Sequence, residues 1–492
     1  MGISKYKVDG NKKVKRIGSI ILILILMLIL FYVATNTNTQ DRVAKLMDTA
    51  WQTTVADAKQ DSLRRQEVTA KKSDISYYDF ESDDIKSLEM DVCSITDGTY
   101  TMKYIMQVIG GPDENGLYPL YICLHGGGSD DEEGLFNNEQ WLEMITYYRD
   151  SVENGIYVAV RGITNNWNLH FEDASYPLYD RLIEDMTLLC NADPNRVYLL
   201  GFSAGGDGVY AIAPRMADRF AAVNQSSGHP NGVTLLNNAN LPTCIQSGIR
   251  DTMFSPKRSV ASAGFDRQLD AYNEEFGFGY AHEVYIHVPE GHNYNDRNPI
   301  EGNGELVLED PQEYVDLMSN PKISDQYPEE NSYYYDDEIN SEYLDLTKKL
   351  GMKIVEKDTN AVRFVSRYTR NAHPDDVVWD LSTRAEERKT NSFYWLQADS
   401  AVNAGIIHAT FDRAENQFNI RFKEKPNGDF NILLHPDMVD FSRPVYVRYG
   451  ERVVEADFKI DEAEILASMT NTMDWDLAYA AHISFSSLGF DD

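Results

Sequence analysis

The stretch RVYLLGFSAGGDGVYAIAPRM, residues 196–216, joins two structural patterns at a single point. Its first half is apolar and rich in β-forming residues, and its second half has the apolar spacing of a helix. Gly201, Ser203 and Gly205 lie at the join and match the pattern G-x-S-x-G. This pattern is typical of a sharp strand-to-helix turn that exposes a serine, because larger side chains two residues away on either side would not fit. The chain is therefore expected to pack this strand and this helix directly against each other.

A second glycine-rich stretch precedes the first. The apolar run YPLYICL leads directly into His125, Gly126, Gly127 and Gly128. Glycines allow backbone N–H groups to approach a substrate oxygen, so Gly126 or Gly127, together with the N–H of Ala204, are candidates for an oxyanion hole. Either motif alone is also compatible with a glycine-rich turn that has no chemical role. The two motifs in this order favour catalysis.

An acid and a histidine follow the serine at the ends of two further strand-like runs. Asp251 comes after CIQSGI, and His292 comes after VYIHVPEG. Open α/β sheets collect their ligands beyond the carboxyl ends of the strands, and hydrolases with this turn have the chain order Ser, Asp, His. We therefore predict Ser203 as nucleophile, His292 as general base and Asp251 as the acid that orients it. His287 is a rival base, although the pattern places it inside a strand, and Glu290 is a rival acid.

Two other groups of residues are candidates for binding. His282 and Glu283 superficially match a zinc-binding helix, but His287 follows at the wrong spacing and in a strand-like run, so we predict no metal. Trp167 and His170 lie in the loop after the run GIYVAV, where a substrate pocket is expected. We predict that both bind substrate. An exposed loop tryptophan can also simply cover apolar surface, which is the alternative for Trp167.

The stretches HGGG, GFSAGG, GIRD and PEGH together resemble the α/β-hydrolase superfamily over residues 90–371. They look like the serine hydrolases grouped with dienelactone hydrolases, polyhydroxyalkanoate-depolymerase-like esterases and prolyl-oligopeptidase-type peptidases. SAGGDGVYAIAPRMADRF is similar to one bacterial branch of that group, which also has a C-terminal β domain. The resemblance implies a mostly parallel sheet with helices on both faces, and the same roles for Ser203, His292 and Asp251. The acidic tract after His292 departs from the family pattern.

Composition shifts divide the rest of the chain. Residues 41–88 are predicted to form a helical stalk or linker, and residues 89–371 the α/β catalytic domain, in which strand-like and helix-like runs alternate. Residues 301–345 hold fourteen acidic residues against one lysine and are expected to form a loop-like insertion. Residues 373–492 consist mostly of short strand-like runs, which predict a separate, sandwich-like β domain.

The N-terminus predicts a membrane anchor. Residues 17–34 carry no charge and are mostly Ile and Leu, and they follow a basic tail, residues 1–16. Such a run is near the lower limit for spanning a bilayer core of about 30 Å. The basic flank is expected to stay in the cytoplasm, which places the bulk of the chain outside it. A cleaved signal peptide is the alternative, but the run is longer than usual for one and no clear cleavage site follows.

The net charge of the chain narrows the classes of partner that it is expected to bind. Asp and Glu number 78 against 45 Lys and Arg, and the net charge of -33 argues against nucleic-acid binding, which needs a basic face. The four cysteines show no metal-type spacing and are expected to be free thiols.

The sequence as a whole predicts a membrane-anchored, extracytoplasmic serine hydrolase of a small-molecule or polymeric ester, which acts through an acyl-enzyme and needs no cofactor. A peptidase of the prolyl-oligopeptidase type, using the same three residues, is the second hypothesis. A non-catalytic adhesion or scaffold protein built on a hydrolase fold is the third. A fold that has lost catalysis usually lacks a member of the triad, and none is missing from this sequence.

Overall fold

A computed structural model describes residues 39–129, 132–252, 257–297, 305–327, 337–385 and 387–490. Within these ranges, no helix combines the length and the apolar character that crossing a membrane requires. The predicted anchor, residues 17–34, and the basic tail before it lie outside the described residues. All four cysteines are free thiols.

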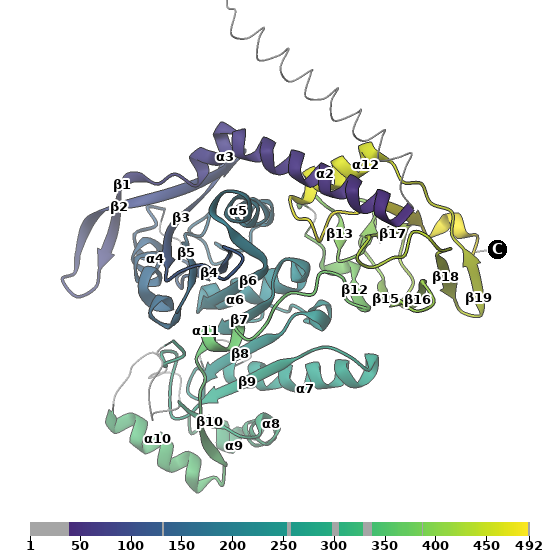
Figure 1. The fold of residues 1–492 in the computed structure, drawn as a ribbon. Helices are drawn as coiled ribbons and strands as arrows, with labels where there is room; N and C mark the ends of the chain where they lie inside the picture. Colours follow the sequence, from purple (N-terminus) through teal and green to yellow (C-terminus); the bar gives the residue numbers. More distant parts are fainter. Residues whose placement is uncertain are drawn as a thin grey trace, which may run out of the picture.

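An 11-stranded sheet forms the centre of the larger part of the molecule (Figure 1). Its central strands are parallel and lie side by side in the order β5 (Gly155–Val160), β4 (Tyr118–Leu124), β6 (Ala192–Phe202), β7 (Ala222–Ser226), β8 (Thr243–Gly248) and β9 (His282–His287). Every residue of β5, β7 and β8 is buried. Burial on both faces explains why these strands appear in the sequence as continuous runs rather than as an alternating pattern.

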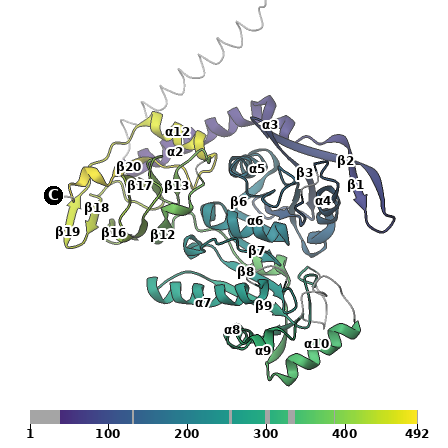
Figure 2. The same ribbon diagram turned by 180° about the vertical axis from the view of Figure 1, so that it is seen from behind.

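Antiparallel strands extend this sheet at both edges. β1 (Lys71–Asp79), β2 (Asp84–Asp97) and β3 (Tyr100–Ile109) continue it beyond β5, and β10 (Glu305–Leu308) and β11 (Ile354–Lys357) continue it beyond β9. The β1–β2 hairpin projects from the body of the molecule (Figures 1 and 2). The prediction of a stalk or linker is wrong for residues 71–88, because they form the β1–β2 hairpin. These largely exposed strands lack the apolar alternation by which a strand is predicted from sequence.

Helices cover both faces of the central strands. α5 (Ser175–Cys190) and α6 (Ala204–Ile212) contribute to the apolar core on one face. α4 (Leu135–Tyr147) and α11 (Ala361–Val365) contribute to the core on the other face, and α7 (Arg258–Phe276) packs on β8 and β9. This architecture confirms the predicted α/β fold, with a sheet that is mixed at its edges.

The acidic tract is mostly folded where the structure describes it, so the expectation of a loop was wrong there. Besides β10 it forms α8 (Pro311–Met318), α9 (Pro321–Ser324) and the first part of α10 (Asp337–Lys349). Asp310 and Asn320 cap α8 and α9, and a proline follows each cap. Tyr314, Met318 and Tyr327 are buried in an apolar cluster that also contains Ile286 of β9 and Ala263 of α7, so the acidic segment packs onto the α/β part.

The segment before the sheet is helical, as predicted, but it is not a free stalk. α2 (Thr39–Gln60) buries Val43, Leu46 and Met47. It packs against α5 of the α/β part and against α12 (Glu462–Thr472) near the end of the chain (Figure 1). α3 (Ser62–Glu67) then leads into β1. α2 therefore joins the two parts of the molecule.

Two smaller sheets follow the α/β part. The 5-stranded sheet has the order β12 (Asp376–Asp380), β15 (Ile406–Asp412), β16 (Gln417–Glu424), β18 (Tyr446–Tyr449), β19 (Arg452–Glu455). The 4-stranded sheet has the order β13 (Ser392–Phe393), β14 (Leu396–Ala398), β17 (Phe430–Leu434), β20 (Ala481–Ser484). Trp379, Trp395 and Phe418 lie in one core that both sheets share, and this core continues into α2, α5 and α6.

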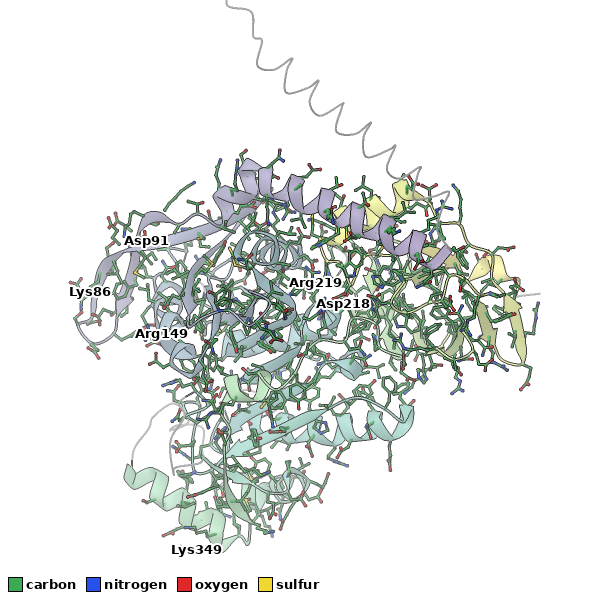
Figure 3. The ribbon with its side chains drawn as sticks, viewed as in Figure 1. Lys86, Asp91, Arg149, Asp218, Arg219 and Lys349 are labelled. Carbon is green, nitrogen blue, oxygen red and sulfur yellow. The ribbon has the colours of Figure 1, made fainter. Side chains whose placement is uncertain are left out.

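Buried ion pairs reinforce this junction. Arg388, which precedes β13, donates from Nε to Asp180 on α5 at 2.8 Å and from Nη1 to Asp218 at 3.3 Å. Arg219 pairs with Asp180 at 3.2 Å and with Asp474 at 3.3 Å. Figure 3 labels Asp218 and Arg219 at this junction. Because removing one partner would leave a buried charge uncompensated, the network makes separation of the two parts costly.

Candidate active site

Ser203 lies at the turn between β6 and α6 in a backbone conformation that non-glycine residues rarely adopt. Its φ is 55° and its ψ is -120°, and its N–H donates to the carbonyl of Ser226 at 2.9 Å. A Cβ added to Gly201 would collide with the backbone of Gly205, and one added to Gly205 would collide with the carbonyl of Leu124. Close backbone packing on both sides of the serine therefore requires the two glycines of the motif.

The structure brings Ser203, His292 and Asp251 together in one chain of hydrogen bonds. Nε2 of His292 lies 3.0 Å from Oγ of Ser203, and Nδ1 lies 2.9 Å from Oδ2 of Asp251. Asp251 is fully buried and His292 is 3% exposed. Because β6, β8 and β9 are parallel strands of one sheet, their carboxyl ends place the three residues at the same edge.

A further charged residue, Arg258, contacts the acid of this chain. Nη1 of Arg258, at the start of α7, donates to Oδ1 of Asp251 at 3.1 Å, and both side chains are buried. Burial alone raises the pKa of Asp251, but His292 and Arg258 outweigh it and hold that pKa below its usual value. Asp251 is therefore an ionised carboxylate shared between two partners. Arg258 was not among the predicted site residues, because no motif marks it.

The loop that carries HGGG lies beside the serine. A Cβ on Gly126 would lie 3.2 Å from Cβ of Ser203. Gly127 and Gly128 have φ values of 116° and 92°, a region that favours glycine. Within the described part of the chain, no acceptor takes the backbone N–H of Gly126, Gly127 or Ala204. These N–H groups are thus available to a substrate oxygen, and that of Ala204 begins α6, where the helix dipole favours negative charge.

The histidines near this loop hold it in place. His125 is fully buried, and its Nε2 accepts the backbone N–H of Gly162 at 3.1 Å. His170 is 1% exposed and donates from Nε2 to the carbonyl of His125 at 2.9 Å. Burial lowers the pKa of His170 to about 3, so its ring is neutral. The ring of His170 thus supports the loop from the protein interior, and its contact with substrate stays a prediction.

Trp167, the other predicted substrate contact, lies at the surface. Its side chain is 57% exposed. A Cβ on Gly128 would lie 2.5 Å from Cε3 of Trp167, so the indole covers that glycine. Trp167 therefore remains a candidate for substrate binding beside the HGGG loop.

An aromatic group next to the serine was not predicted. The ring of Phe202, which directly precedes Ser203, lies 5.4 Å from the ring of His292 and 5.2 Å from that of Tyr147 on α4. The loop after His292 is anchored by Asp296, whose buried carboxylate accepts from Ser226 Oγ at 2.5 Å. The hydroxyls of Tyr147 and Tyr148 also donate to this carboxylate. Single apolar and acidic residues such as these carry no sequence signal of their own.

The rival residues have other contacts, and the acid that lies against Nδ1 of His292 is Asp251. Nε2 of His287 lies 2.9 Å from Oε1 of Gln246, and its ring stacks on that of Tyr294 at 4.1 Å. It is fully buried within the sheet. The backbone carbonyl of Glu290 accepts from the N–H of Arg250 at 3.0 Å.

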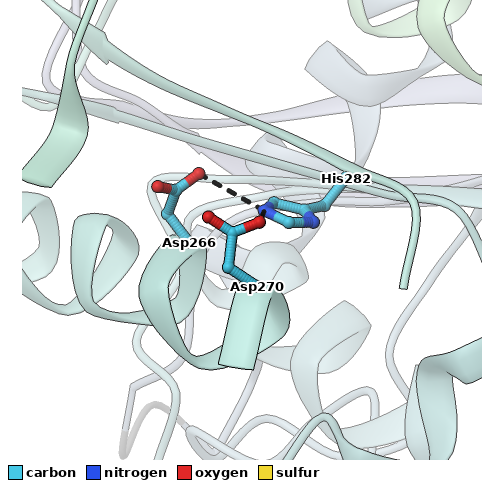
Figure 4. A group of neighbouring side chains, drawn as sticks. All are labelled: Asp266, Asp270 and His282. Atoms are coloured by element: carbon cyan, nitrogen blue, oxygen red, sulfur yellow. Dashed lines mark ion pairs between the residues drawn. The ribbon is translucent and has the colours of Figure 1, made fainter. Parts of the chain in front are cut away.

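His282 and Glu283 do not face a common point with His287. Glu283 pairs with Arg367 at 2.8 Å. His282 instead faces Asp266 and Asp270 of α7, with Nε2 3.4 and 3.8 Å from their carboxylates (Figure 4). These three side chains could hold a metal ion. Although burial opposes it, the aspartates raise the pKa of His282, which favours an ion pair between His282 and the carboxylates.

Comparison with known proteins gives a curated relative that is similar to part of the chain. No protein-family profile matches the chain. A 129-residue segment is 32% identical to the Aspergillus terreus protein named "Probable feruloyl esterase C", and it covers 26% of this chain and 46% of that relative. The chain thus spans about half the length of the relative it matches.

Solved structures with similar folds include several hydrolases. A thermostable esterase is 18% identical and covers 51% of this chain and 69% of its own, with a TM-score of 0.30. A ferulic acid esterase from Anaeromyces mucronatus is 16% identical and covers 46% and 86%, with a TM-score of 0.26. An α/β serine hydrolase homologue from Coxiella burnetii is 14% identical and covers 41% and 88%, with a TM-score of 0.26.

The motifs of the sequence and the observed strand arrangement point to the same fold. The central parallel strands, the helices on both faces and the strained turn at Ser203 are features of one architecture. The larger part of the chain therefore has the fold of the α/β-hydrolase superfamily and resembles its serine hydrolases, as the motifs predicted.

Proposed function

We propose that the chain is a serine hydrolase that cleaves carboxylic esters. The observation that carries this proposal is the hydrogen-bond chain from Ser203 through His292 to Asp251, next to backbone N–H groups that have no acceptor among the described residues. A serine becomes a nucleophile when an adjacent base takes its proton and a third group orients that base. The contacts of Ser203, His292 and Asp251 match these roles.

The proposed reaction has two halves. Oγ of Ser203 attacks the ester carbonyl while Nε2 of His292 takes the hydroxyl proton, and the ionised Asp251 stabilises the imidazolium. The N–H groups of Ala204 and of Gly126 or Gly127 stabilise the negative charge that develops on the carbonyl oxygen. His292 returns the proton to the departing alcohol, leaving an acyl-enzyme. Water, activated by the same histidine, then hydrolyses this acyl-enzyme and restores Ser203.

An ester is favoured over an amide by the name of the curated relative, a feruloyl esterase. The rings of Phe202, Tyr147 and the exposed Trp167 near the serine are also compatible with an aromatic acyl group. The test is turnover by the full-length protein in neutral detergent, with 4-nitrophenyl esters of increasing acyl length, methyl ferulate and peptidyl 4-nitroanilides. Hydrolysis of esters with little cleavage of the anilides supports an esterase. Preferential cleavage of the anilides would instead make the chain a peptidase.

A fluorophosphonate probe tests the nucleophile directly. Such a reagent phosphonylates an activated serine, so it should label the parent protein at Ser203 and leave Ser203→Ala unlabelled. Equal labelling of the two proteins would reject Ser203 as the nucleophile.

The proposal also places the enzyme outside the cytoplasm on a membrane anchor. It rests on the uncharged run at residues 17–34 and on the basic residues that precede it.

A further inference from the structure

α4 lies beside the proposed active site and has two distinct faces. One face packs into the core through side chains that are no more than 2% exposed: Asn137, Trp141 and Met144. The adjoining face carries Glu139, Gln140 and Glu143, and Tyr147 follows one turn later. Since residues three and four positions apart neighbour each other on a helix, these polar side chains form one continuous strip.

Gln140 links this strip to the nucleophile. Its Nε2 donates to Oε2 of Glu139 at 2.7 Å and to Oε2 of Glu143 at 3.2 Å. Both hydrogens of the amide are thereby used, which fixes its orientation and leaves Oε1 as an acceptor. A Cβ on Gly126 would lie 2.9 Å from this Oε1 and 3.2 Å from Cβ of Ser203. The acceptor oxygen of Gln140 therefore lies just across Gly126 from the serine.

Charged groups from two elements meet at the strip. Partial loss of hydration, followed by the charge of Glu139, raises the pKa of Glu143 to about 7, against the opposing effect of Arg297. The guanidinium of Arg297, in the loop after His292, lies 4.0 Å from the centre of the Tyr147 ring. Glu143 thus interacts with both the Glu139 carboxylate and the Arg297 guanidinium, and the strip gains negative charge as Glu143 ionises.

We propose that Glu139, Gln140 and Glu143 form a subsite that accepts hydrogen bonds from an uncharged, hydroxyl-bearing part of the ester and selects against anionic esters. A hydroxyl can donate to Oε1 of Gln140 or to either carboxylate. A carboxylate on the substrate would find no free donor on Glu139, Gln140 or Glu143 and would be repelled by both glutamates. This inference rests on the proposed function and narrows its substrates to neutral esters.

Two esters of equal length test the subsite. 4-Nitrophenyl butyrate and mono-4-nitrophenyl succinate release the same leaving group and differ mainly by a terminal methyl or carboxylate. The full-length parent, Glu139→Gln, Glu143→Gln and the double variant are compared by the ratio of kcat/KM for butyrate to that for succinate. We expect a parent ratio well above one and a fall of roughly tenfold in the double variant at low salt. Glu462→Gln, which removes one negative charge on α12, is the matched control and should leave the ratio unchanged.

The pH dependence of the same ratio gives a second readout. Protonation of His292 affects both esters alike and cancels in the ratio, whereas ionisation of Glu143 acts only on the anionic ester. The ratio should therefore rise between pH 6 and pH 8 in the parent and stay flat in the double variant. A parent that hydrolyses both esters at a ratio unaffected by these substitutions would overturn the subsite and leave the proposed function intact. Absence of any Ser203-dependent hydrolysis would instead reject the proposed function, and the subsite with it.

Discussion

At the scale of single residues, Ser203, His292 and Asp251 are expected to act as one unit. Replacing Ser203 or His292 by alanine should each lower turnover by about 10⁴-fold or more, and losing both should cost little more than losing one. Asp251→Asn should cost somewhat less. Ester hydrolysis and near-ultraviolet circular dichroism measure activity and fold, and the fold should persist. A folded Ser203→Ala protein with parental activity would contradict the proposed mechanism.

Arg258 is expected to set the lower end of the active pH range. Activity should fall at acid pH, because a protonated His292 cannot accept the serine proton. Arg258 competes for the carboxylate of Asp251, so its removal leaves more negative charge to stabilise protonated His292. Arg258→Gln should therefore shift the acid limb of the kcat/KM profile to higher pH. Arg258→Lys, which keeps the charge, should restore the parental limb, and equal limbs for both variants would show that the charge has no such role.

At the scale of helices and strands, the acidic segment supports the loop that carries Asp251. The hydroxyl of Tyr314 on α8 lies 2.6 Å from Oγ of Ser259 on α7, beside Arg258, and the guanidinium of Arg250 lies 5.0 Å from the ring centre of Tyr343 on α10. The segment is therefore part of the folded domain and cannot be removed without exposing an apolar core.

Tyr314 provides a graded test of that support. Tyr314→Ala should lower the free energy of unfolding by about 3–5 kcal/mol, because it removes a fully buried ring. Tyr314→Phe loses only the hydrogen bond to Ser259 and should cost about 1 kcal/mol. Urea unfolding monitored by tryptophan fluorescence measures both. Equal small losses in the two variants would mean that α8 packs loosely and does not support the loop.

Features marked by a contiguous sequence motif could be predicted, whereas features that depend on contacts between distant segments could not. The turn at Ser203 was predictable, because the motif is contiguous in the sequence and Gly201 is required by contact with the backbone of Gly205, within a few residues of the serine. The β1–β2 hairpin and the helices of the acidic segment were not, because exposed strands lack apolar alternation and a few buried tyrosines were masked by many acidic residues. Arg258 and the burial of His170 depend on segments that meet only in the folded chain.

At the scale of the whole molecule, the predicted topology can be tested on intact cells. If residues 17–34 anchor the chain with the basic tail inside, external protease should digest the folded part, and an antibody against residues 480–490 should lose its signal. A cytoplasmic reporter protein is the control for cell integrity. Full protection of the C-terminal epitope in intact cells, with digestion after lysis, would place the fold in the cytoplasm.

The packing of α2 has a consequence for how the protein is made. The side chain of Gln40 donates to the carbonyl of Pro436, 396 positions later in the chain, and α2 rests on α12 further on still. A ribosome therefore releases α2 long before α12, one of the helices on which it packs, is synthesised. Until α12 is synthesised, α2 lacks this native contact. A nascent chain stalled before residue 462 would therefore present the uncovered part of α2 to chaperones or to other chains. The packing of the first described helix is thus completed only when a helix near the end of the chain has been synthesised.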